Sequence, residues 1–411
     1  MSPTNVVALE PSTRRRRPQL RNAGGEVTER HASALELFFD LVFVVAVAEL
    51  AEALLHDPTR LGLLHYVVLF VPIWWAWVGY TFFADRFDND DLIHRAIMLA
   101  AMLAVSSVAE AVPEAFTSPA GSIRFAASYV AVRVLLLLQY ARAHRCVPVA
   151  RPLTGRYLTG FGIGAALWLV SVFVPGPARY ACWAAGVLVE LATPLASASA
   201  IRRVPFHTSH IPERFGLFVL IVLGESVTLD AIGIASSRLD LMASLVVVAG
   251  FFIAAGLWWL YFDCVDSSPM RRWRRTGQVY VYGHLVVFAA ITASGAGVLL
   301  SSRAAAGYQR QEGALETAVP DPALLVDEAR WALCGGIAAF LFAIGTIHLV
   351  NTAPRGDIRA WSRIGLAAAA VLLAVFGAGL PPLAVEAAIV AGLAAEIVLE
   401  VRLICELNVA G

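Results

Sequence analysis

The sequence predicts an all-α integral membrane protein of about twelve transmembrane helices, and three observations favour this class. The 411-residue chain is 59% hydrophobic and 15% charged, with a mean hydropathy of +0.70, whereas soluble domains carry about 25% charged residues. The apolar residues form long uninterrupted stretches, and a helix needs roughly 20 of them to cross the hydrocarbon of a bilayer. The arginines, finally, alternate from one side of the membrane to the other along the chain.

Twelve stretches have the length and composition of transmembrane spans. Residues 1–30 precede them and contain Arg14–Arg17 but no short apolar segment with a cleavage site, so we interpret them as a disordered basic tail and not a signal peptide. The predicted spans are 35–55, 62–84, 95–112, 124–141, 157–174, 179–200, 213–233, 240–262, 278–300, 330–350, 362–379 and 383–403.

The arginines provide an independent test of these spans, because cytoplasmic loops of membrane proteins are enriched in basic residues. All 31 basic residues are arginine. With the N-terminus in the cytoplasm, 23 of them fall in cytoplasmic segments and seven on the opposite side, while Arg133 lies within a span. A missed or additional helix would disturb the alternation after the error. The distribution therefore predicts that both termini are cytoplasmic.

The two halves of the chain resemble each other weakly, which suggests an internal duplication. The first span begins ELFFDLVFVVAVAE (36–49) and the seventh ERFGLFVLIVLGES (213–226), and the sixth and twelfth share AGxxxE, ending at Glu190 and Glu396. Six helices per half, each half beginning in the cytoplasm, predict two parallel six-helix repeats, an arrangement found in some transporters. We therefore divide the membrane part into residues 31–205 and 206–411.

Several ionisable residues fall within the predicted spans, where each costs about 2.5–3.5 kcal/mol at the helix centre unless it faces the interior and pairs. Counting 1.5 Å per residue puts Arg133, Glu190 and Glu225 near the midplane. Such groups are typical of an ion or substrate pathway, and the alternative is a static salt bridge that fixes helix packing. The other candidate pathway residues are Glu49, Asp40, Glu36, His284 and Glu396.

Two polar motifs border the spans on the predicted cytoplasmic side. RFDNDD (86–91) is either a solvated turn that caps the third span or part of a gate. HTSHIPERFG (207–216) spaces two histidines and a glutamate as metal ligands would be on a helix, but Pro212 suits the first helical turn and leaves both histidines in the preceding loop. We therefore expect neither a metal nor a cofactor. The gate candidates are Asp88, Asp90, Asp91, His207, His210, Glu213 and Arg214.

The segments HASALELFFDLVFV (31–44), RFDNDD and ERFGLFVLIVLGES, with WWLYFD (258–263) and YGHL (282–285), resemble the signatures of the bacterial low temperature requirement protein A family. The resemblance extends from about residue 30 to 405. It implies a multi-pass protein of the bacterial inner membrane associated with growth in the cold, and it supplies no settled substrate. The family's motif positions correspond here to Glu36, Asp40, Asp88, Asp90, Asp91, Glu213, Arg214, Gly224 and Glu225.

Two functions are compatible with these residues. The first is a secondary transporter or proton-coupled permease that carries a proton or a small molecule, with Arg133, Glu190 and Glu225 near its central site. The second is a non-transporting stress or lipid-interacting scaffold protein whose buried ion pairs only fix the fold. An enzyme is not expected, since the sequence has neither GxSxG nor HExxH, and a net charge of zero indicates no nucleic-acid partner. The lipid bilayer is the expected partner, and the oligomeric state stays open.

Overall fold

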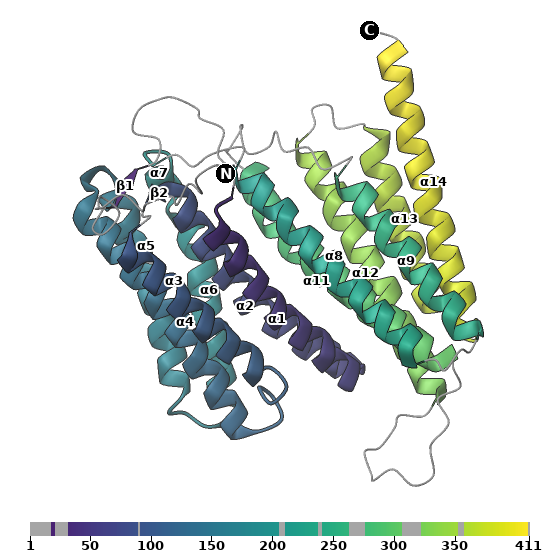
Figure 1. Ribbon diagram of the computed structural model, residues 1–411, viewed down its shortest axis with the longest axis horizontal. Coiled ribbons are helices and arrows are strands. Elements are labelled where there is room, and N and C mark those ends of the chain that lie inside the picture. The colour runs from purple at the N-terminus through teal and green to yellow at the C-terminus, as the bar shows by residue number, and fades with distance from the viewer. Residues whose placement is uncertain are drawn as a thin grey trace, which may run out of the picture. The chain divides into compact units, whose positions relative to one another are not determined.

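The computed structural model describes residues 18–20, 32–88, 91–204, 210–236, 241–262, 276–305, 322–351 and 357–409, which are almost entirely helical (Figure 1). The two short strands are β1 (Gln19–Leu20) and β2 (Phe87–Asp88). The helices are α1 (Ala34–His56), α2 (Arg60–Arg86), α3 (Leu92–Ala111), α4 (Pro119–Cys146), η2 (Pro148–Ala150), α5 (Arg151–Ser171), α6 (Gly176–Ala196), α7 (Ala198–Ile201), α8 (His210–Ser236), α9 (Leu241–Phe262), α11 (Thr276–Ala305), α12 (Pro322–Asn351), α13 (Ile358–Phe376) and α14 (Pro382–Val409).

Each of the twelve predicted spans overlaps one long helix of the described part of the chain. Eight of these helices are long and apolar enough to cross a membrane: α2, α3, α4, α9, α11, α12, α13 and α14. In α1, four acidic residues interrupt the apolar sequence, namely Glu36, Asp40, Glu49 and Glu52. The protein is therefore an all-helical membrane protein with several spans.

The helix boundaries follow from side-chain capping and proline. The side chain of Asp91 accepts a hydrogen bond from the backbone N–H of His94 at the start of α3. Ser118 caps α4 in the same way, and Pro119 occupies the first turn, where no backbone donor is needed. These caps satisfy N–H groups that have no partner within the helix itself.

The described residues form two compact units. The first unit contains α1 up to Ala46, α2 from Val71, α3–α7 and the first two residues of α8. The second unit contains Val47–Phe70 and the chain from Pro212 onward. The end of α1 and the beginning of α2 thus group with the chain from Pro212 onward.

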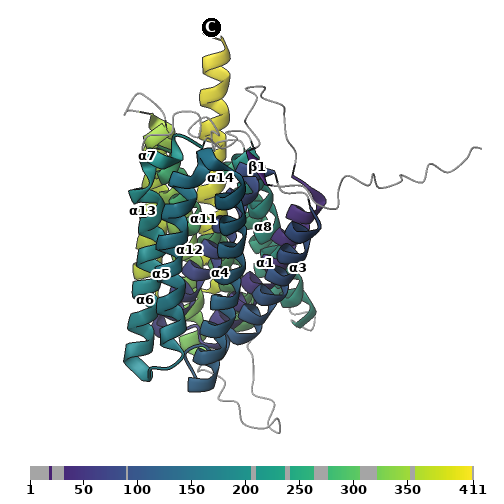
Figure 2. The same cartoon turned by 90° about the vertical axis from the view of Figure 1, so that its left-hand side faces the viewer.

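Within the first unit, α3, α4, α5 and α6 pack against one another in chain order (Figure 2). An aromatic cluster fills the space between them, with the rings of Trp168 and Trp183 stacked at 5.1 Å and that of Tyr129 4.4 Å from Trp168. Gly186 allows α6 to approach α5 closely, because a Cβ there would lie 2.8 Å from the Trp168 ring. Small residues permit such contacts between membrane helices.

In the second unit, α11 packs against α9 and α12, α12 also packs against α13, and α14 packs against α9 and α13. The contact between α11 and α12 depends on glycine. A Cβ at Gly297 would lie 2.5 Å from the backbone nitrogen of Leu333, and a Cβ at Gly336 would lie 2.8 Å from the carbonyl oxygen of Ala290. The two backbones are therefore in direct contact.

The predicted disordered tail needs one correction. Gln19 and Leu20 form β1, which pairs with β2 in an antiparallel register that places Gln19 opposite Asp88 and Leu20 opposite Phe87. Phe87 is buried, so the pairing satisfies the backbone of a segment that lies against the apolar core. The sequence prediction failed here because a two-residue strand has no periodicity to detect.

Candidate functional site

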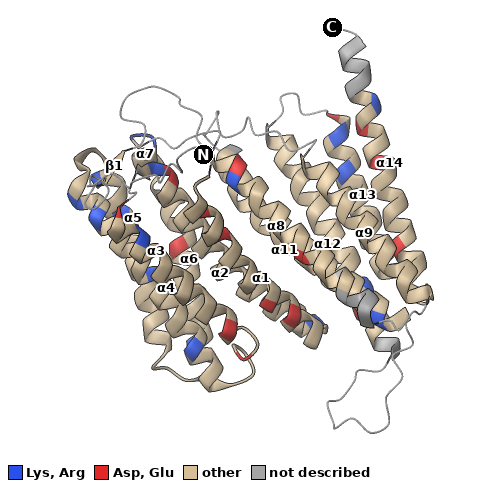
Figure 3. Ribbon diagram, in the orientation of Figure 1, with Lys and Arg blue, Asp and Glu red and all other residues tan. Residues whose placement is uncertain are grey.

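Charged residues occur along the described helices as well as at their ends (Figure 3). A fully buried pair joins α4 and α6 in the first unit. Nε of Arg133 donates a hydrogen bond of 3.0 Å to Oε1 of Glu190, and both side chains are 0% exposed. The hydroxyl of Tyr129 donates to the other carboxylate oxygen of Glu190 at 2.9 Å. Arg133 lies midway along the 28-residue α4, about 20 Å from either end at 1.5 Å per residue.

Two glycines and an aromatic ring position this pair. A Cβ at Gly164 of α5 would lie 2.4 Å from Cγ of Glu190, and one at Gly79 of α2 would lie 3.2 Å from Nη1 of Arg133. The guanidinium carbon of Arg133 lies 4.7 Å from the centre of the Phe161 ring, within range of a cation–π interaction. The charged groups thus occupy space that the two glycines leave open.

The terminal nitrogens of Arg133 differ from those of Arg330 in their hydrogen bonding. Nη1 and Nη2 are buried, and neither has a hydrogen-bond partner among the residues that the structure describes. Arg330 of α12 is also buried, yet it donates from Nε to the carbonyl of Ala374 and from Nη1 to that of Gly377, and it pairs with Asp327 through Nη2. Arg330 therefore binds the carboxyl end of α13, whereas Arg133 uses only Nε.

The third residue predicted for the midplane, Glu225, belongs to α8 in the second unit and is half-buried. The structure thus pairs Arg133 with Glu190 inside one unit and assigns Glu225 to the other. Of the prediction of a trio, the structure supports the contact between Arg133 and Glu190.

A second polar group lies where α1, α2 and the first residues of α8 meet in the first unit. Nε1 of Trp77 donates to Oδ1 of Asp40 at 2.7 Å. Nδ1 of His210 lies 3.0 Å from Oδ1 of Asp85, and its Nε2 lies 3.9 Å from Oε2 of Glu36. All five side chains are buried. The histidine therefore bridges carboxylates from two helices.

The prediction that His210 lies in a loop was wrong. α8 begins at His210, two residues before Pro212, because the first helical turn tolerates a proline and the imidazole gains carboxylate partners. Its two nitrogens face different carboxylates, so they do not converge on one ion. Among the described residues, no group of three or more histidine, cysteine, aspartate or glutamate side chains could hold a metal ion.

The other described gate candidates cap a helix, contribute backbone to a strand or lie in the first turns of α8. Asp91 is 1% exposed, caps α3 and accepts a hydrogen bond of 2.7 Å from Nη2 of Arg142, so it is not a solvated acid. Asp88 contributes its backbone to β2. Arg214 is buried and Glu213 half-buried in the first turns of α8. Asp90 and His207 lie outside the described residues.

In the second unit, His284 of α11 is completely buried, with Nε2 2.8 Å from the Tyr261 hydroxyl and Nδ1 2.6 Å from the Tyr280 carbonyl. Glu396 of α14 accepts a hydrogen bond of 2.7 Å from Ser362. Glu49, the remaining pathway candidate, is half-buried in α1. The contact of His284 with Tyr261 joins α11 to α9, and that of Glu396 with Ser362 joins α14 to α13.

Sequence reasoning missed an ion pair one helical turn beyond Glu396. Nε of Arg363 donates to Oε1 of Glu400 at 2.9 Å, and both side chains are buried. The arginine count assigned Arg363 to a cytoplasmic loop. The spacing of four residues between Glu396 and Glu400 places both on one helix face, and this signal would have indicated that α14 presents acids to α13.

At the start of α13, Asp357 caps the helix and contacts three groups of two residues, Arg359 and His348. It accepts hydrogen bonds from the backbone N–H and the side chain of Arg359, and it lies 2.8 Å from Nε2 of His348. These contacts, above all the hydrogen bond from Arg359, hold the pKa of the Asp357 carboxyl well below its ordinary value of 3.8. The group lies before the span of α13 and fixes the junction with α12.

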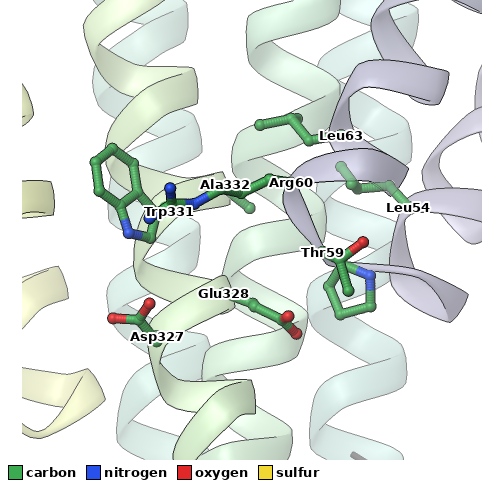
Figure 4. Close-up of a pocket in the computed structure, with 9 residues that line it drawn as sticks. Leu54, Thr59, Arg60, Leu63, Asp327, Glu328, Trp331 and Ala332 are labelled. Carbon is green, nitrogen blue, oxygen red and sulfur yellow. The ribbon is translucent and has the colours of Figure 1, made fainter.

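A small cavity of about 90 Å³ opens at the α1–α2 turn in the second unit (Figure 4). The guanidinium of Arg60 lies over the ring of Trp331 at 5.6 Å, while Asp327 and Glu328 of α12 project from the neighbouring turn. Nine residues line the cavity: Leu54, Pro58, Thr59, Arg60, Leu63, Asp327, Glu328, Trp331 and Ala332.

The long apolar helices and the buried charges define a multi-pass, all-helical membrane protein. Residues 31–398 match the family described as bacterial low temperature requirement A protein (LtrA). The chain belongs to this family, which confirms the resemblance of its motifs. It is also similar to Uncharacterized protein RA0937 of Rhizobium meliloti (strain 1021), with 29% identity over 276 residues that cover 63% of this chain and 67% of the relative.

Proposed function

We propose that the protein is a proton-coupled secondary transporter of the bacterial inner membrane with a central site at Arg133 and Glu190. The proposal includes twelve spans in two parallel six-helix halves, with both termini in the cytoplasm. The observation that carries it is a buried arginine beside a carboxylate, at the centre of a helix apolar enough to span a membrane, whose terminal nitrogens have no hydrogen-bond partner in the described part of the chain. Ionisable groups at this depth are costly and characteristically serve ion or substrate movement.

The carboxylate of Glu190 is the natural proton carrier of this site. The neutral hydroxyl of Tyr129 and the charged guanidinium of Arg133 both donate hydrogen bonds to this carboxylate. Protonation of Glu190 would therefore change its contacts with α4. Secondary transporters couple such local changes to rearrangement of whole helices around a central site. The family name further suggests that the transported solute matters for growth at low temperature.

The alternative is a non-transporting scaffold protein, and one observation favours it. Arg330 and Arg179 are buried arginines that bind carbonyl groups at helix ends, Arg179 through the carbonyls of Ser171 and Pro119. Buried arginines thus serve the fold elsewhere in this chain. The scaffold hypothesis requires that Arg133 does the same.

Proton movement into proteoliposomes distinguishes these functions. The purified full-length chain is reconstituted with an internal pH-sensitive dye, a pH gradient is imposed, and a mixture of small anions, cations and neutral solutes is supplied outside. We expect solute-dependent proton flux in the wild type and its loss in Glu190→Gln and Arg133→Gln. Arg124→Gln is the matched control, because Arg124 lies on the same helix but pairs with Glu110 and Glu114 in exposed positions.

The control also defines what a negative result means. Arg124→Gln should retain the flux, since exposed ion pairs contribute little to stability. Equal solute-dependent flux in the wild type and in both buried variants contradicts transport through this site. The absence of solute-dependent flux from a wild type that remains folded by circular dichroism favours the scaffold.

A further inference from the structure

We infer that the transported solute is a carboxylate anion, bound by the terminal nitrogens of Arg133 while Glu190 holds the co-transported proton. This inference rests on the proposed function and specifies the substrate class of the same site. Its starting point is the set of N–H donors that the protein itself leaves unused.

Arg133 has donors on Nε, Nη1 and Nη2, and arginine has no acceptor and does not deprotonate in proteins. Nε binds Glu190, while both terminal nitrogens are buried and lack a hydrogen-bond partner among the described residues. Buried polar groups are generally satisfied. A charged guanidinium with two free terminal nitrogens inside the helices is thus the chemical signature of a missing acceptor.

The geometry of the terminal N–H groups of Arg133 indicates which kind of acceptor fits them. The Phe161 ring lies over it, and the ring of Tyr129 lies 6.0 Å from its central carbon. Because aromatic rings cover a face of the guanidinium, an acceptor would approach the edge that carries the terminal N–H groups. This edge presents two parallel donors in the plane of the group, which match the two oxygens of a carboxylate.

Two other buried arginines satisfy their donors on the backbone, although Nη1 of the buried Arg363 also lacks a hydrogen-bond partner among the described residues. Arg330 uses all three of its nitrogens, on two helix-end carbonyls and Asp327. Arg179 binds carbonyls through Nε and Nη1. Arginines that only stabilise helix ends therefore find backbone acceptors, and Arg133 has none on its terminal nitrogens within the described chain.

Charge balance couples the anion to a proton. Arg133 and Glu190 together are neutral, so an added carboxylate would leave one net negative charge among fully buried side chains. Burial of an uncompensated charge is strongly unfavourable. If Glu190 takes up a proton from solution when the anion binds, the guanidinium and the anion form the neutral pair. One proton accompanies each anion: it forms an O–H bond on the Glu190 carboxylate when the anion binds and leaves when the anion is released, and the solute itself is unchanged.

The variant Glu190→Gln reproduces the neutral state of Glu190 permanently. Gln lacks the negative charge that competes for the guanidinium, and its amide oxygen can still accept from Nε of Arg133. We expect this variant to bind the anion without proton uptake and to lose the pH dependence of binding. Arg133→Lys keeps the positive charge but has no planar fork, so its affinity should fall about tenfold or more.

The test is a binding experiment that does not require transport. The full-length chain in detergent, in weakly buffered solution near neutral pH, is titrated with pyruvate, gluconate and benzoate, with inorganic phosphate as a second oxyanion, choline as a cation and mannitol as a neutral solute. Calorimetry measures affinity and a pH dye measures proton uptake. We expect a carboxylate to bind with uptake of one proton in the wild type and in Arg124→Gln.

Each outcome bears on one of the two claims. Carboxylate binding with proton uptake but no flux in proteoliposomes would keep this inference and overturn transport. Flux that follows choline, mannitol or phosphate, with no carboxylate bound, would overturn the inference and keep transport. Carboxylate binding that is unchanged in Arg133→Lys, or the absence of binding by any carboxylate tested to a folded wild type, also overturns it.

Discussion

Arg133 of α4 donates from Nε to Oε1 of Glu190 in α6 at 3.0 Å, and neither side chain is exposed. This contact joins two helices that are not neighbours in the sequence, through charged groups at the centre of the first unit. A purely structural pair would use as many donors as its geometry allows, as Arg330 does with the end of α13. Nη1 and Nη2 of Arg133 have no hydrogen-bond partner among the residues with described positions, which makes the pair a candidate for ligand binding.

The stability of the two single variants should be unequal. Removing either partner of a static buried ion pair typically costs about 3–5 kcal/mol. In our account Glu190 can become neutral by taking up a proton, so Arg133→Gln should cost less than this range. Glu190→Gln, without a bound carboxylate, leaves a buried guanidinium that does not deprotonate and should cost about 3 kcal/mol or more. Denaturation in detergent, with the double variant completing the cycle, measures the difference. Equal and large losses in both single variants would indicate a static pair.

Two glycines of α5 provide a matched test of how Glu190 is positioned. A Cβ at Gly164 would lie 2.4 Å from Cγ of Glu190, whereas one at Gly162 would have nothing within 4 Å. Gly164→Ala should therefore displace the carboxylate and reduce solute-dependent proton flux strongly. Gly162→Ala should leave flux unchanged and stabilise the helix by roughly 0.5–1 kcal/mol. The idea fails if flux is the same in both variants.

The acid dependence of stability should reflect Asp357. Its folded pKa is depressed, first by the hydrogen bond from Arg359, so its contribution is complete above the ordinary aspartate value of 3.8 and is lost as the pH falls toward the folded value. Asp357→Asn keeps a good N-cap and removes the charge. The difference in melting temperature between wild type and variant should stay constant near neutral pH and shrink under acid conditions below the ordinary value. A difference that grows on acidification would have the opposite sign to this account.

Loss of the histidine at the start of α8 should destabilise the first unit. His210→Ala removes the imidazole that lies 3.0 Å from Oδ1 of Asp85, and a hydrogen bond to a charged group contributes about 1.5–3 kcal/mol. His56→Ala is the control, since His56 forms an exposed contact with Glu52 at 3.5 Å and should change stability by less than about 0.5 kcal/mol. Thermal unfolding of the two variants tests this, and equal melting temperatures would show that the His210 contact does not stabilise the fold.

The sequence predicted the long helices well, because apolar length along one chain segment is a local property. Depth along the membrane normal also brought Arg133 and Glu190 together correctly. Depth alone could not tell which unit a residue belongs to, and Glu225, at a similar predicted depth, lies in the second unit. Lateral position depends on helix packing, which hydropathy does not encode.

The sites that sequence reasoning missed have a common cause. Arg363 lies near the start of α13, and a count of arginines in loops treats such a residue as exposed. His210 was assigned to a loop because Pro212 suits the first helical turn, and its carboxylate partner, Asp85, is 125 positions away in the sequence. Contacts of this range arise only once the helices pack.

Solute exchange by Glu190→Gln in proteoliposomes tests the central claim most directly. A transporter whose proton site is permanently neutral should still exchange labelled for unlabelled carboxylate across the membrane, because binding at Arg133 persists, but it should no longer accumulate the solute in response to a pH gradient. We predict retained exchange and lost proton-driven uptake, with both activities intact in Arg124→Gln. Proton-driven uptake by Glu190→Gln at the wild-type rate would contradict the assignment of Glu190 as the proton carrier.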